Sequence, residues 1–279
     1  MTKLGLIAGG GALPITLARH CRSIGRQLFL IRLEGFASTE LGQFDGCDLT
    51  LGRLGAAFEA LHGSGCVSVC MAGSVARPAM RDLRPDLRGL AALPGAVAAA
   101  AKGDDALLTF LLGEFEREGF VVEGAHEVMS ELALNEGALG RHRARRPHRH
   151  DLERAVEAAA AIGRLDAGQG AVVCEGLILA LEAQEGTDAM LERVAKLPSS
   201  IRGDSRHRRG VLAKVSKPGQ ERRVDLPTIG PGTIRRASEA GLAGIAGEAG
   251  LTLVVERDRV VAMADELGLF VVGVRSQAK

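Results

Sequence analysis

The chain has 279 residues and a formal net charge of +1, with 46% hydrophobic and 25% charged residues. This composition is typical of a soluble globular protein, and the length predicts one large or two ordinary domains. A net charge so close to zero, with 3% aromatic residues and no Trp or Tyr, argues against general nucleic-acid binding, which needs cations on phosphates and rings on bases.

The cysteines and the N-terminus indicate the compartment. An odd number of scattered cysteines gives no disulfide framework and predicts buried thiols in a reducing environment; they are Cys21, Cys47, Cys66, Cys70 and Cys174. The first glycines come too early for a secretory signal, and no run reaches the ~20 apolar residues that span a bilayer. We therefore expect a cytoplasmic protein, for which peripheral contact with a membrane surface stays open.

The N-terminal half alternates strands and helices. Apolar runs predict strands at 4–8, 28–33, 48–51, 66–71 and 120–122, and helical spacing predicts helices at 13–24 and 54–61 and from 104 to 115. This order predicts a Rossmann-like α/β domain with a parallel sheet over residues 1–134. The Ala- and Leu-rich segment 75–103 predicts helical pieces, with breaks at Pro78, Pro85 and Pro94.

Small residues follow two of these strands. Gly9, Gly10 and Gly11 come after the first strand, and Gly73 and Ser74 follow the fourth. Glycines in this position let a phosphate approach the backbone. The dinucleotide fingerprint is incomplete, because Pro14 stands at its third glycine, although Glu34 ends the second strand as a ribose-binding acid would. A nicotinamide site and a plain strand-to-helix turn both fit.

The middle of the chain carries acids and then bases. A helix begins at Lys102, Asp104 and Asp105. Acids in this position are interpreted as capping residues that complement the helix dipole rather than as metal ligands. Residues 135–150 are basic and broken by proline, which predicts a linker between domains. Such a run could touch anionic lipid headgroups, although a solvated linker is favoured. Its histidines have no regular metal-ligand spacing.

The C-terminal half, 151–279, predicts a second, mixed α/β domain. Helices are expected at 151–162, 189–195, 234–240 and 257–267. A hairpin is expected at 171–174 and 177–182, and further strands at 211–213, 252–255 and 269–274. The apolar closing strand could pair between chains.

The stretch 212–233 concentrates chemistry suited to phosphates. Its strand ends in Lys214 and leads to Lys217; a turn and an extended run at 223–226 with Asp225 follow, and then a glycine-rich entry to a helix. Lysines neutralise phosphate oxygens, and a helix N-terminus binds anions. Asp225 could hold a divalent metal or position water. Ordinary turns and solvated lysines would give the same residue types.

Seven ordered motifs carry a resemblance: GGGALP at 9–14, MAGS at 71–74, KGDD at 102–105, EGTDAM at 185–190, KVSKPGQ at 214–220, DLPTIG at 225–230 and ADELGLFV at 264–271. In this order they resemble the UDP-2,3-diacylglucosamine pyrophosphatases of lipid A biosynthesis, in the family unrelated to calcineurin-like metallophosphoesterases. The resemblance spans nearly the whole chain. Cys174 departs from it, since a polar residue is expected there.

The resemblance implies an enzyme that hydrolyses UDP-2,3-diacylglucosamine to UMP and 2,3-diacylglucosamine 1-phosphate (lipid X). It implies Mg²⁺, two α/β domains with substrate between them, a homodimer, and transient contact with the cytoplasmic face of the inner membrane. It matches Asp225 to the family's essential acid. The paired Asp and His elements of two-metal phosphoesterases are missing from the sequence.

These observations give a set of site residues. Asp225, Lys214 and Lys217 are the catalytic candidates, and Asp225 and Asp188 are the candidate metal ligands. The candidate substrate-binding residues are Gly9, Gly10, Gly11, Ala12, Gly73, Ser74, Lys102, Asp104, Gln169, Gly186, Thr187, Gln220, Thr228 and Gly230. The helices within 75–115 could line an acyl-chain channel or simply form core. Two alternatives stay open, an NAD(P)-dependent oxidoreductase and a non-catalytic lipid or nucleotide-sugar carrier.

Overall fold

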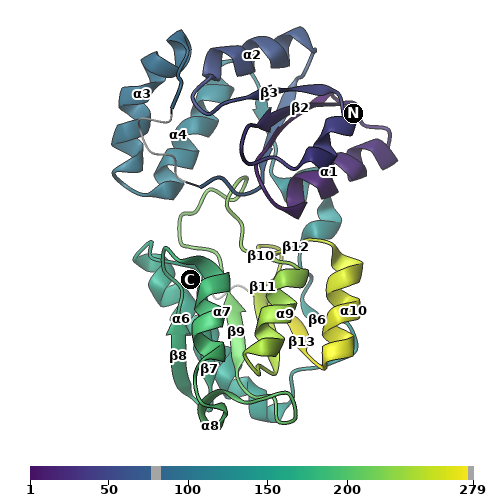
Figure 1. Cartoon of the computed structure of the whole chain (residues 1–279), viewed down its shortest axis with the longest axis vertical. Helices are drawn as coiled ribbons and strands as arrows, with labels where there is room; N and C mark the ends of the chain where they lie inside the picture. The colour runs from purple at the N-terminus through teal and green to yellow at the C-terminus, as the bar shows by residue number, and fades with distance from the viewer. Residues whose placement is uncertain (77–82, 276–279) are drawn as a thin grey trace. The chain divides into compact units, whose positions relative to one another are not determined.

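The structure, a computed structural model, describes residues 1–76 and 83–275. The predicted break at Pro78 lies outside the described residues. The chain forms two compact units, Met1–Ser130 with Glu221–Asp225, and Glu131–Gln220 with Leu226 onward (Figure 1). The five residues Glu221–Asp225 therefore pack with the first unit, although the residues before and after them belong to the second unit.

The first unit is an α/β unit built on a five-stranded sheet. Its strands are β1 (Leu4–Ala8), β2 (Leu28–Leu33), β3 (Gly46–Leu49), β4 (Ser68–Ala72) and β5 (Val121–Val122). Its helices are α1 (Ala12–Ser23), α2 (Leu54–Gly63), α3 (Leu87–Ala100), α4 (Asp104–Arg117) and α5 (Ala125–Val128), with the 3₁₀ turns η1 (Thr39–Gln43) and η3 (Ser130–Leu132).

All strand pairs in this sheet are parallel, in the order β3-β2-β1-β4-β5. Successive residues of a strand point to opposite faces. One face packs on α2 and α4 through a core that includes Phe58, Phe115 and Val69. The opposite face of β1 and β2 contacts α1. The predicted parallel Rossmann-like sheet is confirmed.

Helix α3 differs from its prediction. It begins after Asp86, whose carboxylate accepts a hydrogen bond from the N–H of Gly89 at 2.8 Å. The residues around Pro85 are not helical, as expected, but Pro94 lies inside α3 and does not end it. A proline removes one N–H from the helical ladder, and here the remaining bonds keep the helix continuous.

The second unit is built on a six-stranded mixed sheet. Its strands are β6 (Gly137–Leu139), β7 (Gly170–Cys174), β8 (Leu177–Leu181), β9 (Val211–Lys214), β11 (Gly244–Glu248) and β13 (Phe270–Val274), with β10 (Thr228–Ile229) and β12 (Leu253–Val254) as a separate parallel pair. Its helices are α6 (Arg146–Arg164), α7 (Gly186–Ala195), α8 (Ser199–Arg202), α9 (Pro231–Glu239) and α10 (Arg257–Leu267).

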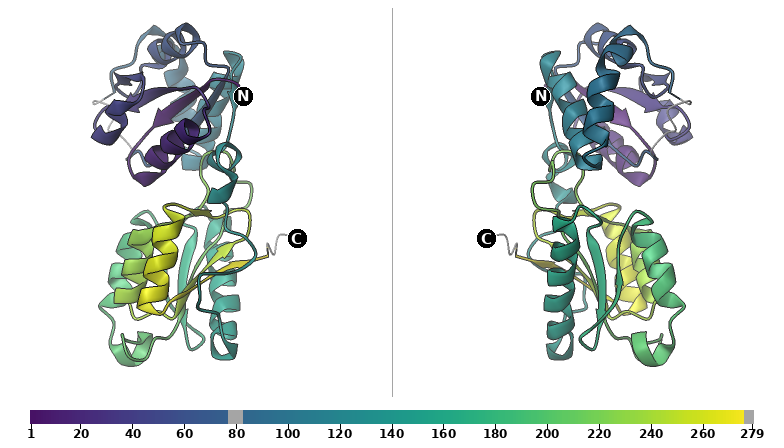
Figure 2. Two further views of the ribbon diagram at one scale, coloured as in Figure 1. Left: turned by 90° about the vertical axis from the view of Figure 1, so that its right-hand side faces the viewer. Right: turned by 90° about the vertical axis from the view of Figure 1, so that its left-hand side faces the viewer.

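Helices cover both faces of this sheet, whose order is β6-β13-β11-β9-β7-β8. One face packs on α7, α9 and α10 through a core that includes Met190, Ile234 and Val260. The other face packs on α6 through Ala155, Ala159 and the strands beneath them. Figure 2 shows α6 and α10 on opposite sides of the sheet. The central strands β9, β11 and β13 are parallel, so their carboxyl ends share one edge.

Two expectations for this unit need correction. Residues 135–150, expected as a linker, contain β6, which pairs with β13, and the first turn of α6, which has a proline in its opening positions. The closing strand β13 lies between β6 and β11, so both of its edges are already paired. It therefore has no free edge with which to pair between chains. None of the described helices is both long enough and apolar enough to cross a membrane.

Candidate functional site

The two glycine loops of the first unit are joined to each other. Gly10 N–H donates to the carbonyl of Ser74 at 2.8 Å, and Ser74 N–H donates back to the carbonyl of Gly10 at 3.0 Å. Gly73 has a φ of 96°, and a Cβ placed there would lie 2.5 Å from the carbonyl oxygen of Gly10. Only glycine fits this crossing. The candidate substrate-binding residues Gly9 to Ala12 and Gly73 to Ser74 therefore form one cradle, a contact that the sequence did not predict.

This cradle lies where the strand order of the parallel sheet reverses. From β1 the chain passes to β2 on one side, and β4 lies on the other side. In open parallel sheets, ligands bind at the carboxyl ends of strands at this reversal. Gly11 caps α1, and a Cβ placed on it would meet no atom within 4 Å. Gly11 is also exposed, and the start of a helix is a position that suits an anion.

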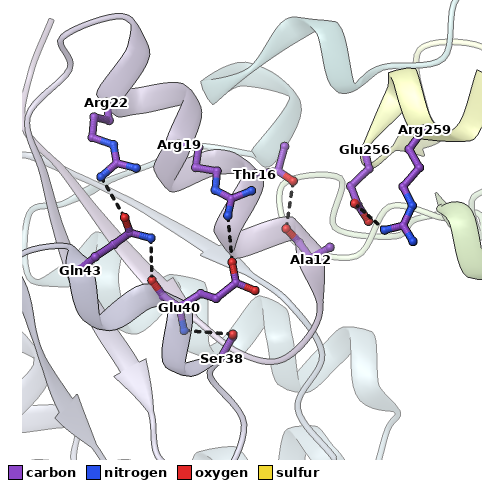
Figure 3. A network of polar contacts seen from close by, with 9 residues as sticks. All are labelled: Ala12, Thr16, Arg19, Arg22, Ser38, Glu40, Gln43, Glu256 and Arg259. Carbon is purple, nitrogen blue, oxygen red and sulfur yellow. Dashed lines mark hydrogen bonds and ion pairs between the residues drawn. The ribbon is translucent and has the colours of Figure 1, made fainter.

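Helix α1 is held in place by η1. Arg19 and Arg22, both on α1, reach Glu40 at 2.8 Å and Gln43 at 3.2 Å, as Figure 3 shows. Thr16 donates its hydroxyl to the carbonyl of Ala12 at 3.0 Å. The two arginine contacts hold the C-terminal half of α1 against η1.

Asp225 belongs to a five-residue segment, Glu221–Asp225, that packs on the first unit. The N–H of Glu221 donates to the carboxylate of Asp105 at 2.8 Å. Arg223 binds Glu116 at 2.6 Å and Glu221 at 2.8 Å, and Val224 packs in the core beneath α2 and α4. The hydrogen bond from Arg223 lowers the pKa of Glu221 from its usual value.

The segment is a turn, whereas an extended run was expected at 223–226. The N–H groups of Val224 and Asp225 both donate to the carbonyl of Glu221, at 3.3 Å. Its anchor, Asp105, lies in the first turn of α4, beside Asp104 and just after Lys102. Because α4 leads into β5, this turn lies at the carboxyl edge of the sheet, the same edge as the glycine cradle. The predicted Lys102 and Asp104 are thus sequence neighbours of Asp105, which binds the turn that carries Asp225.

Both predicted lysines lie at one edge of the second unit. Lys214 ends β9 and is buried; its Nζ donates to the carbonyl of Thr228 at 2.9 Å. Lys217 pairs with Asp166 at 2.7 Å, and its N–H donates to Oε1 of Gln220 at 2.8 Å. Thr228 leads directly to Gly230, the cap of α9. The predicted Lys214, Lys217, Gln220, Thr228 and Gly230 therefore form one cluster.

Buried acids at this edge were not predicted. Glu248 ends β11 beside Lys214, and its carboxylate accepts hydrogen bonds from the N–H and hydroxyl of Ser216, at 3.2 and 2.5 Å. Glu182 follows β8 and accepts from the hydroxyl of Thr187 at 3.0 Å. Position gave a signal for Glu182, which ends the predicted strand 177–182, whereas Glu248 lies at the end of β11, a strand that the sequence pattern did not predict.

Two polar atoms at this edge lack partners. Among the described residues, Oε2 of Glu182 and Oε1 of Gln169 are buried without a hydrogen-bond partner. The backbone of Glu182 binds Gly170, directly after Gln169, at 2.9 Å. Buried oxygens of this kind normally find a donor, and a bound ligand or water would supply one here. Gln169 and Thr187 are thus joined to the lysine edge through Glu182 and β7.

Asp188 has different surroundings. It lies on α7, directly after Gly186 and Thr187, and pairs with Arg236 of α9 at 3.4 Å with 60% of its side chain exposed. Over residues 1–76 and 83–275, no group of three or more His, Cys, Asp or Glu side chains could hold a metal ion. Mg²⁺ often takes one or two carboxylates and completes its shell with water and substrate phosphates. The ion pair with Arg236 argues against Asp188 as a metal ligand, and Asp225 as a ligand stays a prediction from the sequence.

Two family models match this sequence, one in each half of the chain. The LpxI N-terminal domain model matches residues 3–132, and the LpxI C-terminal domain model matches residues 135–272. The chain belongs to the LpxI family. A protein of Caulobacter vibrioides named UDP-2,3-diacylglucosamine pyrophosphatase LpxI is 58% identical over 279 residues, which is 100% of each chain. The resemblance inferred from the motifs is confirmed.

The two LpxI domain models match continuous stretches of sequence, whereas the two compact units of the structure do not. The LpxI C-terminal domain runs through residues 221–225. Their contacts place them with the N-terminal unit. The segment that carries Asp225 therefore lies within the C-terminal LpxI domain in sequence and packs with the N-terminal unit.

Proposed function

We propose that this chain hydrolyses the pyrophosphate bond of UDP-2,3-diacylglucosamine, releasing UMP and 2,3-diacylglucosamine 1-phosphate in lipid A biosynthesis. The observation that carries this proposal is the 58% identity, over the full length of both chains, to a protein of that name. The oxidoreductase alternative rests on Gly9, Gly11 and Glu34 alone. Glycine loops suit any phosphate-bearing ligand, so they do not favour a nicotinamide.

Binding of the diphosphate is assigned to groups that attract anions. In the first unit, the exposed Gly11 caps α1 beside the glycine cradle, and we assign the N–H groups there to phosphate oxygens. In the second unit, Lys214 and Lys217 place cations at the carboxyl edge of the sheet. Negative charge grows on the leaving phosphate as the P–O bond breaks, and fixed cations stabilise it. We assign Lys214 and Lys217 this role.

Asp225 is assigned to the attacking water. A carboxylate within reach of the water accepts its proton as the water oxygen bonds to phosphorus. Mg²⁺, when bound, would polarise the phosphate oxygens as a Lewis acid, and Asp225 and substrate oxygens would hold it. Asp188 as a second ligand stays a prediction from the sequence, which its pairing with Arg236 disfavours.

A homodimer remains part of the proposal. The second sheet ends in β6 and β8, and within the part of the chain that the structure describes, β8 pairs on one side only. Leu177, Ile178 and Leu181 on this strand are exposed. Open apolar edges readily pair with another chain. Light scattering on the native protein and on Leu177→Lys tests this, since a dimer joined at β8 should weaken in the variant.

The function is tested by product analysis. We expect purified protein with UDP-2,3-diacylglucosamine and Mg²⁺ to release UMP and lipid X in equal amounts, as detected by mass spectrometry. Chelation of divalent ions should stop the release. Recovery of intact substrate would reject the proposal, and a substrate-dependent change in NAD(P)H absorbance would favour the oxidoreductase. Intact substrate that copurifies with the protein would favour the carrier.

A further inference from the structure

Helix α3 has its large side chains on the outside. Leu87, Leu90 and Val97 are 87%, 56% and 47% exposed, and Gly89 is the buried residue of the helix. Most helices of globular proteins bury their large apolar residues and expose polar ones. In α3 this order is reversed.

The exposed residues form a continuous face. Residues at spacings of three and four lie on one side of a helix. The outer stripe of α3, as we call it, consists of exposed residues at this spacing, all of them apolar: Leu87, Leu90, Ala91, Pro94, Val97 and Ala98. These residues are uncharged and run along the whole helix. Arg88, which is also exposed on α3, pairs with Glu118 at the end of α4.

The inner face of α3 holds it close to α4. A Cβ placed on Gly95 would lie 2.6 Å from the ring of Phe110 on α4. The two helices are neighbours (Figure 1). A small residue at the contact lets the helices approach closely, and it leaves Leu87, Leu90 and Val97 pointing away from the unit.

Cations border the outer stripe. A shallow depression of ≈ 510 Å³ is lined by Arg53, Arg84, Pro85, Asp86, Leu87 and Leu90. Arg53 and Arg84 are exposed there, whereas the carboxylate of Asp86 is turned onto the N–H groups of Gly89 and Ala56, at 2.8 and 2.9 Å. Lys102, also exposed, follows the far end of the helix and precedes the exposed Asp104. Guanidinium groups next to leucines match phosphate headgroups above acyl chains.

We propose that the outer stripe of α3 docks this protein on a bilayer of anionic phospholipid, with Leu87 and Leu90 entering the headgroup boundary and Arg53 and Arg84 binding lipid phosphates. The inference rests on the proposed function in one respect, because a diacylated substrate would be taken from a bilayer. An uncharged apolar face with cations beside it supplies the two attractions that hold a peripheral protein at such a surface.

The extent of the stripe argues against a second copy of the chain as its occupant. A helix of 14 residues is about 21 Å long and about 10 Å wide, so one face offers about 200 Å², against the ~800 Å² per partner of a stable interface. The basic run at 141–150 is a weaker candidate for lipid contact. Arg141 there pairs with Asp265, and Arg143 donates to the carbonyl of Gly140.

The test compares two pairs of substitutions in the first unit. Leu87→Glu/Leu90→Glu places charge in the outer stripe, and Val67→Glu/Val121→Glu places equal charge at valines that are 49% and 60% exposed elsewhere. All four side chains are exposed, so both variants should keep the thermal midpoint of the native protein. The full-length proteins are sedimented with vesicles of phosphatidylcholine, with and without phosphatidylglycerol.

We expect native protein and the valine variant to sediment with the anionic vesicles, and less so in high salt. The leucine variant should bind at least tenfold more weakly, since each buried methylene contributes to transfer into lipid. Native protein that binds no vesicle, or equal binding by both variants, would overturn the docking. A leucine variant with half the native mass in solution would also overturn it, because the stripe would then be an interface between copies.

Turnover separates this inference from the proposed function. UMP release from detergent-dispersed substrate should be the same in native protein and the leucine variant, and release from vesicle-borne substrate should fall in the variant only. Absence of release by native protein in detergent would reject the enzymatic proposal, while the sedimentation result would still decide the docking.

Discussion

The carboxylate of Asp105 accepts a hydrogen bond of 2.8 Å from the backbone N–H of Glu221, 116 positions further along the chain. This bond holds the turn Glu221–Asp225 on the start of α4. The acid assigned to catalysis, Asp225, is thereby positioned by a unit other than the one that precedes and follows it in sequence.

Replacing Asp105 should therefore lower turnover. A hydrogen bond to a charged acceptor contributes about 1.5–3 kcal/mol, so Asp105→Ala should reduce kcat by roughly 10- to 100-fold through misplacement of Asp225. Asp105→Asn keeps an acceptor oxygen and should lose less. Steady-state UMP release at saturating substrate checks this. Equal rates for the alanine variant and native protein would mean that Asp105 does not position Asp225.

Gly73→Ala should destabilise the first unit. The new Cβ would lie 2.5 Å from the carbonyl oxygen of Gly10 and 2.8 Å from Pro14 Cγ. Backbone strain at a φ of 96° adds to this overlap. We expect a loss of about 3 kcal/mol in the free energy of unfolding. Gly25→Ala, with a φ of 70° and open space around it, is the control and should lose about 1 kcal/mol. Urea unfolding of both variants separates the steric overlap at Gly73 from the backbone strain that both positions share. Equal losses of unfolding free energy would mean that the contact between Gly73 and Gly10 is not tight.

Stability should fall in acid through Glu123. Arg26 binds its carboxylate at 2.6 and 2.9 Å. Burial raises the pKa of Glu123, but the hydrogen bonds from Arg26 and Ser68 outweigh it and leave the pKa below the ordinary value of 4.5. A carboxyl with a lowered pKa stabilises the fold above its unfolded pKa, and that stabilisation is lost as the pH falls through the folded pKa.

Glu123→Gln should therefore cost about 3 kcal/mol at neutral pH, because it leaves Arg26 buried without its counter-charge. The difference in stability between this variant and native protein should shrink as the pH drops below 4.5, the ordinary pKa of a glutamate. Thermal midpoints across the acid range measure this. Glu40→Gln, in an exposed pair with Arg19, should change little at any pH. A Glu123→Gln difference that is independent of pH would contradict the account.

Periodicity predicted most of the fold, since runs such as Leu4–Ala8 and Leu28–Leu33 are strongly apolar. It missed β11, Gly244–Glu248, the central strand of the second sheet. Its sequence GIAGE has low strand propensity, but the packing requires it, because a Cβ on Gly244 would lie 2.4 Å from the ring of Phe270. Close packing between strands is a tertiary property that local patterns do not contain.

The sequence predicted which residues belong to the candidate site and where they lie on the strands, but not which partners they contact. The glycine cradle and the lysine edge follow from strand ends, which sequence patterns locate well. The partners of the lysines, Asp166 and the carbonyl of Thr228, depend on how loops from distant strands meet. The placement of Glu221–Asp225 on α4 could not be read locally, because its anchor Asp105 is distant in sequence.

The most direct measurement is the rate of UMP release from UDP-2,3-diacylglucosamine by Asp225→Asn, compared with Asp188→Asn and native protein under the same conditions. Loss of a group that takes the proton of the attacking water predicts a roughly thousandfold lower kcat for Asp225→Asn with little change in KM. Asp188→Asn, which breaks only an exposed ion pair with Arg236, should stay within about twofold of native protein. A near-native rate for Asp225→Asn would contradict the assignment of catalysis to this acid.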